Sequence, residues 1–446
     1  MSKLHQLWEH LRSSLWFVPT LLVLGSVALA VGMIEAESFV EREQLTTRWP
    51  RLFGAGAEGA RGMLAAIAGS MITVAGVAFS ITVVTFALAS SQYTSRILRN
   101  FMRDGSNQAV LGVFLGVFAY CLVVLRTIRG GDEGMFVPSV AVLVAVLLGF
   151  VAVGFLVFFI HHIAASIQAS NIIHGAAAET IRAIDRLFPE DETGTGDAPD
   201  PSPQRGDERW TTLPAKTTGY IQAIEAGPLE RVASKLGTVI RMERGIGDFV
   251  IEATPLASLA GRAADGATIS TVNAACTVGR YRTVHQDAAF GIRQIVDIAL
   301  KALSPGINDT TTAVICTDFL GSILVRLAPR DVGRSRGSNG EGPRVILPGP
   351  TFAGFLSEAF DQIRQNAEGN VAVLTRLLQV LEIIADQTNN PRRRRELMEQ
   401  AVLVMETAER SVPSARDRGV IKAAMDRLVE GVGPRERPGK SLPGAP

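Results

Sequence analysis

The densest group of polar side chains in this sequence lies between residues 280 and 309, and three roles are open to it. In a catalytic role, His285 would act as a general base that Asp287 orients. In a binding role the group would hold a ligand or an ion, and in a structural role it would join helices or subunits. The residues concerned are Arg280, Arg282, His285, Asp287, Arg293, Asp297, Asn308 and Asp309.

The spacing within this group favours the structural role. Arg293 and Asp297 are four residues apart, so on a helix they lie on one face and form an ion pair. Asp309 follows a Ser-Pro-Gly helix stop at 304–306, and a carboxylate at that place is typical of the N-cap of a new helix. The sequence around the group contains no nucleophile motif, phosphate-binding loop or metal-ligand spacing. We therefore predict no catalytic residue, no metal site and no cofactor, and we expect that the protein is not an enzyme.

A second pattern lies in residues 62–91, which contain no Asp, Glu, Lys or Arg. This stretch is longer than the roughly 20 apolar residues that a helix needs to cross a bilayer. Its small and hydroxyl side chains recur at helical spacing and so form a stripe on one face. Such a stripe either allows close packing of another helix or lines a narrow watery path. The stripe consists of Gly69, Thr73, Gly76, Ser80, Ala87 and Ser91.

Three further apolar runs predict a bundle of four transmembrane helices within residues 1–188. The runs are 15–34, 108–125 and about 136–160. The first run competes with a signal peptide, but it is about as long as a full span and no small-x-small cleavage site follows it. The run at 108–125 contains a Gly-x-x-x-Gly pattern, which is typical of close helix packing. We expect the last span to continue as a helix to residue 188.

Composition limits the function classes. The chain has 446 residues, of which 47% are hydrophobic and 20% charged, as expected for a protein that is partly in a membrane. Its formal net charge of +1 creates no global field that would attract nucleic acid. The spans contain no ionisable residue in their cores, which argues against a proton-coupled carrier acting alone. The three cysteines indicate no disulfide framework.

Four spans place both chain ends on the same side of the membrane. Basic residues are nearly balanced between the two sides, so the orientation depends on two features. The N-terminus is basic, with Lys3 and Arg12, and acidic residues follow the first span at Glu35, Glu37 and Glu41. We expect a bacterial inner-membrane protein with both termini in the cytoplasm.

The remainder of the chain predicts a cytoplasmic α+β domain that is mostly helical towards its C-terminus. Residues 219–224 are predicted to form a strand, and 238–259 a strand, a tight turn and a strand. Arg392 to Arg395 are predicted to be a solvated helix start after Pro391. The predicted parts are an acidic, proline-rich flexible linker (189–214), a soluble α+β domain (215–330), a loop (331–350), a helical part (351–432) with breaks at 387–391 and 412–414, and a disordered tail (433–446).

The polar run also carries a family resemblance. Its pattern RT-x-x-QD…FGIRQ…DIA-x-x-ALSP-x-xND resembles a bacterial family of predicted integral membrane proteins, the domain of unknown function 2254. The stretches SSQYTSRILRNFMRD…QAVLGVFLGVF and GDFVIEATPL share the resemblance, which covers most of the chain. It implies the topology but no catalytic residues. Thr310 departs from the pattern, because a proline is expected after Asn308-Asp309.

Two function classes follow. The protein is either a homo-oligomeric, channel-like or transport protein that its cytoplasmic domain regulates, or a non-conducting membrane scaffold or sensor that recruits partners. The expected partners are the lipid bilayer and further copies of the chain. The sequence identifies no protein partner and no small ligand of the soluble domain.

Overall fold

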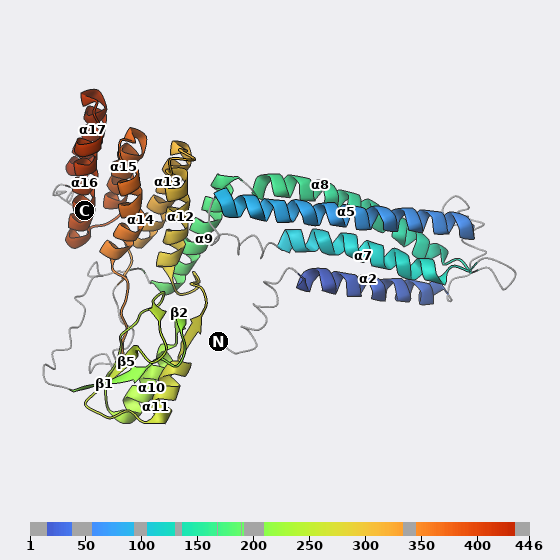
Figure 1. Ribbon diagram of the computed structural model, residues 1–446, viewed down its shortest axis with the longest axis horizontal. Helices are drawn as coiled ribbons and strands as arrows, with labels where there is room; N and C mark the ends of the chain where they lie inside the picture. Colours follow the sequence, from blue (N-terminus) through green and yellow to red (C-terminus); the bar gives the residue numbers. More distant parts are fainter. Residues whose placement is uncertain are drawn as a thin grey trace, which may run out of the picture. The chain divides into compact units, whose positions relative to one another are not determined.

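The structure is a computed structural model, and it describes residues 16–37, 56–92, 105–129, 136–166, 168–188, 190, 209–332 and 345–432. The chain divides into two compact units, Met1–Asn171 and Ile172–Pro446 (Figure 1). Most of the predicted linker, the C-terminal tail and most of the stretch SSQYTSRILRNFMRD lie outside the described residues.

Four long apolar helices form the main described part of the first unit, as the sequence predicts. They are α2 (Phe17–Ala36), α5 (Ala57–Gln92), α7 (Gly105–Thr127) and α8 (Ser139–Ser166). Each provides a segment long and apolar enough to cross a membrane, and α7 packs against the other three. α5 has 36 residues, which corresponds to about 54 Å and exceeds the roughly 30 Å hydrocarbon core of a bilayer.

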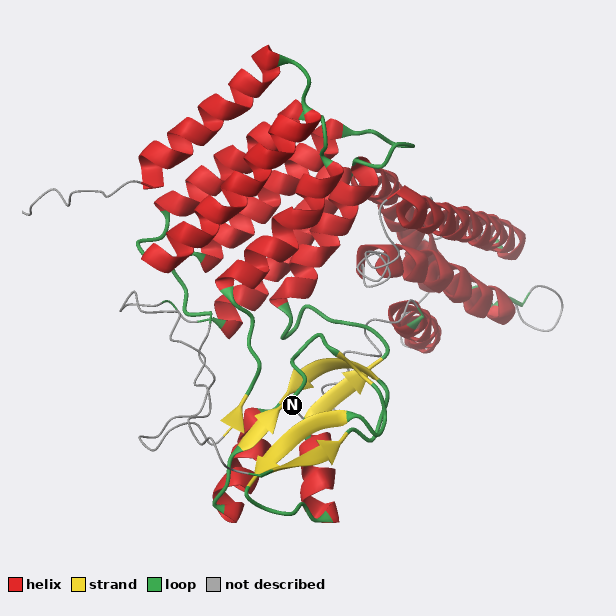
Figure 2. Ribbon diagram, turned by 60° about the vertical axis from the view of Figure 1, so that its left-hand side comes forward, coloured by secondary structure: helices red, strands yellow, loops and turns green. Residues whose placement is uncertain are grey.

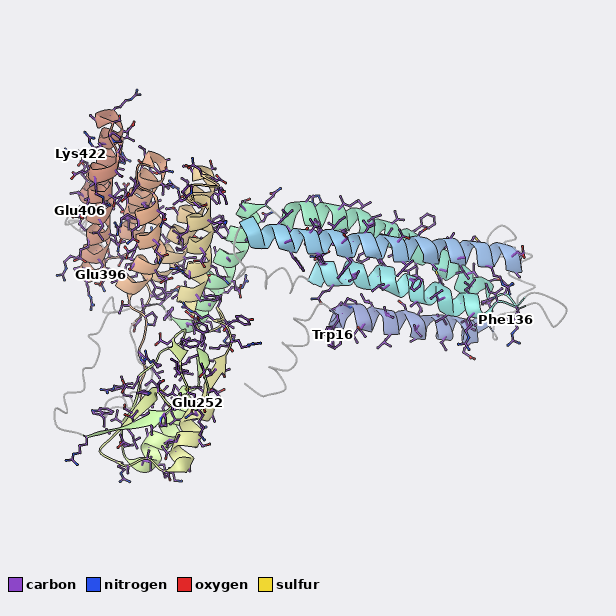
Figure 3. The ribbon with its side chains drawn as sticks, in the orientation of Figure 1. Trp16, Phe136, Glu252, Glu396, Glu406 and Lys422 are labelled. Carbon is purple, nitrogen blue, oxygen red and sulfur yellow. The ribbon has the colours of Figure 1, made fainter. Side chains whose placement is uncertain are left out.

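The outward faces of this bundle are apolar. Phe150 of α8 is 71% exposed, Val157 is 65% exposed, and Leu24 of α2 is 61% exposed. Exposed aromatic side chains lie at both ends of the bundle, Trp16 before α2 and Phe136 before α8 (Figure 3). Apolar surface of this kind suits lipid tails, and aromatic side chains are frequent at membrane–water interfaces. The first unit is therefore a membrane bundle.

Two glycines bring α2 and α7 close together. A Cβ atom at Gly112 would lie 2.5 Å from Leu22 Cδ1 and 3.0 Å from Pro19 Cα. A Cβ atom at Gly116 would lie 2.5 Å from Ser26 Oγ. The Gly-x-x-x-Gly pattern therefore marks a helix contact inside the bundle, as predicted.

Two charged side chains bind backbone groups at the end of the bundle where α2 ends and α8 begins. Glu37 accepts hydrogen bonds from the backbone N–H groups of Ser139 (2.8 Å) and Val140 (3.0 Å). Arg61 donates through Nη2 to the carbonyl oxygen of Ile128 (2.8 Å), just after α7. An acidic side chain at a helix start and a basic side chain at a helix end bind backbone groups that have no partner within the helix. Their charges also interact favourably with the helix dipole. The sequence gives no sign of this role of Glu37, because its partners are about 100 residues away.

Replacing Glu37 by Ala should lower the free energy of unfolding of the bundle by about 1–2 kcal/mol, because the first amides of α8 lose their acceptor. Glu37→Gln keeps one acceptor oxygen but removes the charge, so it should lose less. Thermal unfolding of the three proteins in one detergent measures the difference. Equal stability of the wild type and Glu37→Ala would show that the cap contributes nothing.

The fourth span does not continue to residue 188 as one helix, which corrects the prediction. α8 ends at Ser166, and α9 (Ala169–Leu187) begins after a break. At the break, Asn171 Nδ2 donates to the carbonyl oxygen of Ala165 (2.8 Å). From Ile172 onwards α9 belongs to the second unit. The boundary between the units therefore precedes most of α9 instead of following it.

The second unit contains a β module of two small sheets. One has the strand order β1-β5-β3-β7 and the other β4-β2-β6. All neighbouring strands are antiparallel except β3 and β7. The strands lie between the longer helices and the short helices α10 (Ala226–Leu236) and α11 (Gly266–Ala274) (Figure 2). The strands are β1 (Trp210–Pro214), β2 (Gly219–Ile224), β3 (Ile240–Met242), β4 (Phe249–Val250), β5 (Pro255–Ala260), β6 (Cys276–Gly279) and β7 (Val345–Ile346).

Three predictions about this module are corrected. β1 falls inside the predicted linker 189–214, yet it pairs with β5 along its whole length. β7 falls inside the predicted loop 331–350, and its Val345 is buried beside Ile240. In the predicted strand–turn–strand at 238–259, β3 pairs with β5, whereas β4 joins the other sheet. Very short strands with distant partners leave little periodic signal in the sequence.

Six helices of the second unit form a two-layered stack (Figure 2). Within each layer the helices pack side by side in chain order, and each helix also contacts the next one in the chain. The predicted breaks after α15 and α16 are confirmed, and a further break separates α14 from α15. One layer contains α12 (Ala288–Ala302), α14 (Phe352–Asn366) and α16 (Pro391–Ser411), and the other contains α13 (Thr310–Leu327), α15 (Val371–Asp386) and α17 (Ala415–Val432).

Two helices of the stack differ from what their composition suggests. α13 is also long and apolar enough to cross a membrane, but it packs against α12, α14 and α15. Arg393 in α16 was predicted to be solvated, but the structure buries it, and it is only 2% exposed. Its Nη1 donates to the carbonyl oxygen of Ala328 (2.8 Å), and its guanidinium lies 5.1 Å from the centre of the Phe352 ring. A paired, stacked arginine is compatible with burial, and the four-arginine pattern does not show which one is buried.

Candidate functional site

The polar run forms its most buried contact at the start of α12. Arg282 donates through Nε to Asp287 Oδ2 (2.8 Å) and through Nη2 to Asp287 Oδ1 (3.0 Å). Asp287 is 5% exposed and also accepts from the backbone N–H of Phe290 (3.0 Å), so it is the N-cap of α12. Burial alone would lower the pKa of the Arg282 guanidinium, but the hydrogen bond and charge of Asp287 more than offset this and raise that pKa.

A turn of the β module rests directly on this ion pair. Gly247 has φ 89°, and a Cβ atom there would lie 2.5 Å from Asp287 Oδ2 and 3.0 Å from Arg282 Nη2. Only glycine combines that backbone conformation with the space required. The backbone N–H of Gly247 donates to the carbonyl oxygen of Ile221 (2.8 Å), which fixes the turn to β2. The Gly-Asp-Phe stretch of the family pattern therefore meets the Arg-Thr-x-x-Gln-Asp stretch in space.

The segment between Arg280 and Asp287 also ties α9 and β2 to α12. The carbonyl oxygen of His285 accepts from Arg186 Nη2 of α9 (2.6 Å). The side-chain oxygen of Gln286 accepts from the backbone N–H of Ile224 at the end of β2 (3.1 Å). Arg280 itself is exposed at the end of β6. We call this contact region between α9, β2, the 245–248 turn and the start of α12 the polar joint.

The geometry does not favour the catalytic interpretation of His285. Both oxygens of Asp287 are engaged by Arg282, and the imidazole is exposed. Asp287 is therefore held as a cap and an ion-pair partner, which does not suit a carboxylate that must orient a histidine base.

Arg293 links two helices of the stack. Its Nε lies 3.0 Å from Asp297 Oδ1, as the spacing predicts. Its Nη1 also lies 3.5 Å from Glu358 Oε1 on α14. Glu358 was not predicted as a partner from the sequence, because nothing in the local pattern connects residues 65 positions apart.

Asn308 and Asp309 shape the turn between α12 and α13. Asn308 has φ 50°, a conformation that asparagine tolerates better than most residues. Asp309 is the predicted N-cap, and it accepts from the hydroxyl (2.6 Å) and the backbone N–H (3.0 Å) of Thr312. These two bonds lower the pKa of Asp309. Thr310, where a proline was expected, accepts a hydrogen bond from Asn370 Nδ2 (2.8 Å), a contact that proline could not make.

The stripe on α5 faces away from the other helices of the bundle. The described stripe residues Gly69, Thr73, Gly76, Ser80 and Ala87 are exposed, and the side chain of Ser91 lies outside the described residues. The buried positions of α5 lie on the opposite face and include Leu64, Ala68, Met71, Ala75 and Ala78. A Cβ atom at Gly69 or Gly76 would meet no described atom within 4 Å. Among the residues that the structure describes, the stripe is therefore not a packing seam within one copy of the chain.

These features define a multi-pass membrane protein that carries an α+β unit held together by a polar joint. The chain belongs to the family described as "Predicted membrane protein (DUF2254)", which matches residues 12–383. The resemblance that the sequence motifs indicate is thus confirmed.

The relatives of the chain include two mycobacterial proteins. They are the uncharacterized protein Rv1290c of Mycobacterium tuberculosis and the uncharacterized protein Mb1321c of Mycobacterium bovis. Each is 34% identical over 445 residues, which cover 98% of this chain and 83% of the relative. No solved structure matches the chain.

Proposed function

We propose that the protein is a homo-oligomeric, channel-like protein of the bacterial inner membrane, and that its α+β unit lies in the cytoplasm and regulates the membrane part. Both chain termini would then be cytoplasmic. In this proposal the polar joint is structural, and the protein has no catalytic centre. The observation that carries the proposal is the outward position of the α5 stripe.

The stripe supports an oligomer for a physical reason. Small side chains offer lipid tails little contact surface, but they allow a second helix to approach closely. A self-complementary face of this kind suits symmetric assembly of identical copies. The hydroxyls of Thr73 and Ser80 would supply dipoles beside a central path. Because the stripe carries no charge, such a path would select only weakly between ions.

A bulky residue in the stripe should prevent oligomer formation without changing the fold of each copy. Thr73 is exposed on the outward face of α5, so each copy with Thr73→Trp should fold normally, while oligomer formation and ion flux into liposomes should fall at least tenfold. Ile81→Trp is the control, because Ile81 is 40% exposed and lies about a quarter-turn from the stripe on the same helix. Size-exclusion chromatography with light scattering measures assembly. A wild-type protein that is monomeric and conducts no ion would refute the proposal.

The helical stack favours one alternative, a non-conducting scaffold or sensor. Its six helices form two layers in a regular succession, and stacked helix pairs in repeat proteins often bind protein partners along their surface. A stable wild-type oligomer without flux for any ion, with a partner that binds the isolated second unit, would support the scaffold instead.

A further inference from the structure

We propose that the outer face of α16 binds the same face of a second copy of the chain, with the two helices antiparallel. α16 is the last helix of its layer, and it packs against α14, α15 and α17. The side that faces away from these helices is exposed in the described part of the chain, and Figure 3 shows Glu406 of this side at the outer edge of the stack. This contact is separate from the α5 stripe, so the inference goes beyond the proposed function.

The outer face of α16 repeats every seven residues. Arg395, Val402 and Glu409 are exposed and seven positions apart, so they form one row along the helix. Met398 and Met405 are half-buried and form a second row beside the first. Two adjacent rows of this kind are the seam through which helices pair in coiled coils. We call these five residues the α16 seam.

The order of charges along the α16 seam matches an antiparallel copy. Arg395 and Glu409 lie seven residues before and after Val402. A two-fold axis beside Val402 therefore places Arg395 opposite the partner's Glu409, and Val402 opposite the partner's Val402. A parallel pair would instead bring like charges together. Arg395 and Glu409 take part in none of the described ion pairs, whereas Arg392 and Arg410 of the same helix do.

The middle of the α16 seam is apolar. The surface is hollowed beside Met398 and Val402, and helical spacing puts both methionines on one side of the row. Across the two-fold axis, Met398 therefore faces the partner's Met405, and the flexible thioether chains fill the hollow. Glu399 and Glu406 are exposed at the other edge of the seam, where their carboxylates stay in water.

The size of the contact suits copies that share a membrane. A contact made by one helix from each copy is smaller than the roughly 1,200–2,000 Å² of a standard interface. Confinement to one bilayer raises the local concentration of the copies, which strengthens a weak contact without adding to it. The test therefore uses the full-length protein in liposomes.

A cysteine on the two-fold axis tests the contact. Val402→Cys places two thiols against each other, so oxidation with copper phenanthroline should join more than half of the chains into dimers. The three native cysteines are buried and do not compete. Ile307→Cys is the control, because Ile307 is 44% exposed, against 43% for Val402, and lies in the turn between α12 and α13. At the same protein-to-lipid ratio its yield of dimer should be at least fivefold lower.

A charge swap tests the antiparallel order. In the Val402→Cys protein, Arg395→Glu should lower the dimer yield at least fivefold, and adding Glu409→Arg should restore it to within twofold. Adding Glu252→Arg instead gives the same net charge but lies in the β module (Figure 3), so it should restore nothing. Equal yields for Val402→Cys and Ile307→Cys, or no rescue by Glu409→Arg, would overturn the proposal. Neither measurement involves ion flux or the α5 stripe, so the result is independent of the channel proposal.

Discussion

Gly116→Leu should destabilise the membrane bundle by about 3 kcal/mol and release α2 from α7. A Cβ atom at Gly116 would already lie 2.5 Å from Ser26 Oγ and 3.4 Å from the carbonyl oxygen of Leu22. The backbone carbonyl cannot rotate away, so α2 must move to admit a larger side chain. Overpacking of a tight contact typically costs about 1–3 kcal/mol, and a helix backbone contact lies at the upper end. Thermal unfolding in detergent, together with protease accessibility of α2, measures the effect.

Gly154→Leu is the matched control for this substitution. In the described part of the chain, a Cβ atom at Gly154 of α8 would meet no neighbour within 4 Å. The two variants therefore add the same side chain to a transmembrane helix, but only Gly116→Leu adds it to a helix contact. If both variants unfold at the wild-type temperature, α2 is not packed on α7 through these glycines.

Asp287→Ala should have the largest effect in the second unit, a loss of about 3–4 kcal/mol in the free energy of unfolding. The substitution leaves the half-buried Arg282 without its bidentate partner and removes the N-cap of α12. Truncating one member of a buried ion pair costs about 3–5 kcal/mol because the other charge stays desolvated, and the partial exposure of Arg282 reduces this. Chemical denaturation of the isolated second unit, residues 172–446, measures it.

Asp309→Ala measures the effect of losing a helix cap alone, without the loss of an ion pair such as Arg282–Asp287. Asp309 also caps a helix, α13, but it is exposed, and it accepts from the hydroxyl and the backbone N–H of Thr312 and pairs with no arginine among the described ion pairs. Its loss should cost about 1 kcal/mol. Equal losses for Asp287→Ala and Asp309→Ala would show that the ion pair with Arg282 contributes nothing beyond capping.

The polar joint explains why the most distinctive part of the sequence contains so many charged residues without a catalytic pattern. Asp287 accepts hydrogen bonds from Arg282 and from the first turn of α12, and the turn at Gly247 lies directly against it. Neighbouring residues of the same run contact α9 through Arg186 and β2 through Ile224. The bonds of Asp287 satisfy polar groups that would otherwise be buried without a partner. The run therefore determines how three parts of the second unit are assembled.

The sequence alone determined the elements whose signal is local. The apolar runs predicted α2, α5, α7 and α8, since a helix that crosses a bilayer must be apolar along about 20 consecutive residues. The Arg293–Asp297 pair and the Asp309 cap also depend on residues within one helical turn. The Gly-x-x-x-Gly pattern indicated a close helix contact, although it did not identify α2 as the partner.

Only the tertiary structure decided the contacts between residues that are distant in the chain. It placed Gly247 on the Arg282–Asp287 pair and Glu358 beside Arg293. It turned the α5 stripe outwards, because the alternate face of that helix carries Leu64 and Met71, which pack on its own bundle. Helical periodicity shows that two faces differ, but both were apolar or small, and hydrophobicity alone does not tell which of them meets a neighbouring helix and which remains on the surface.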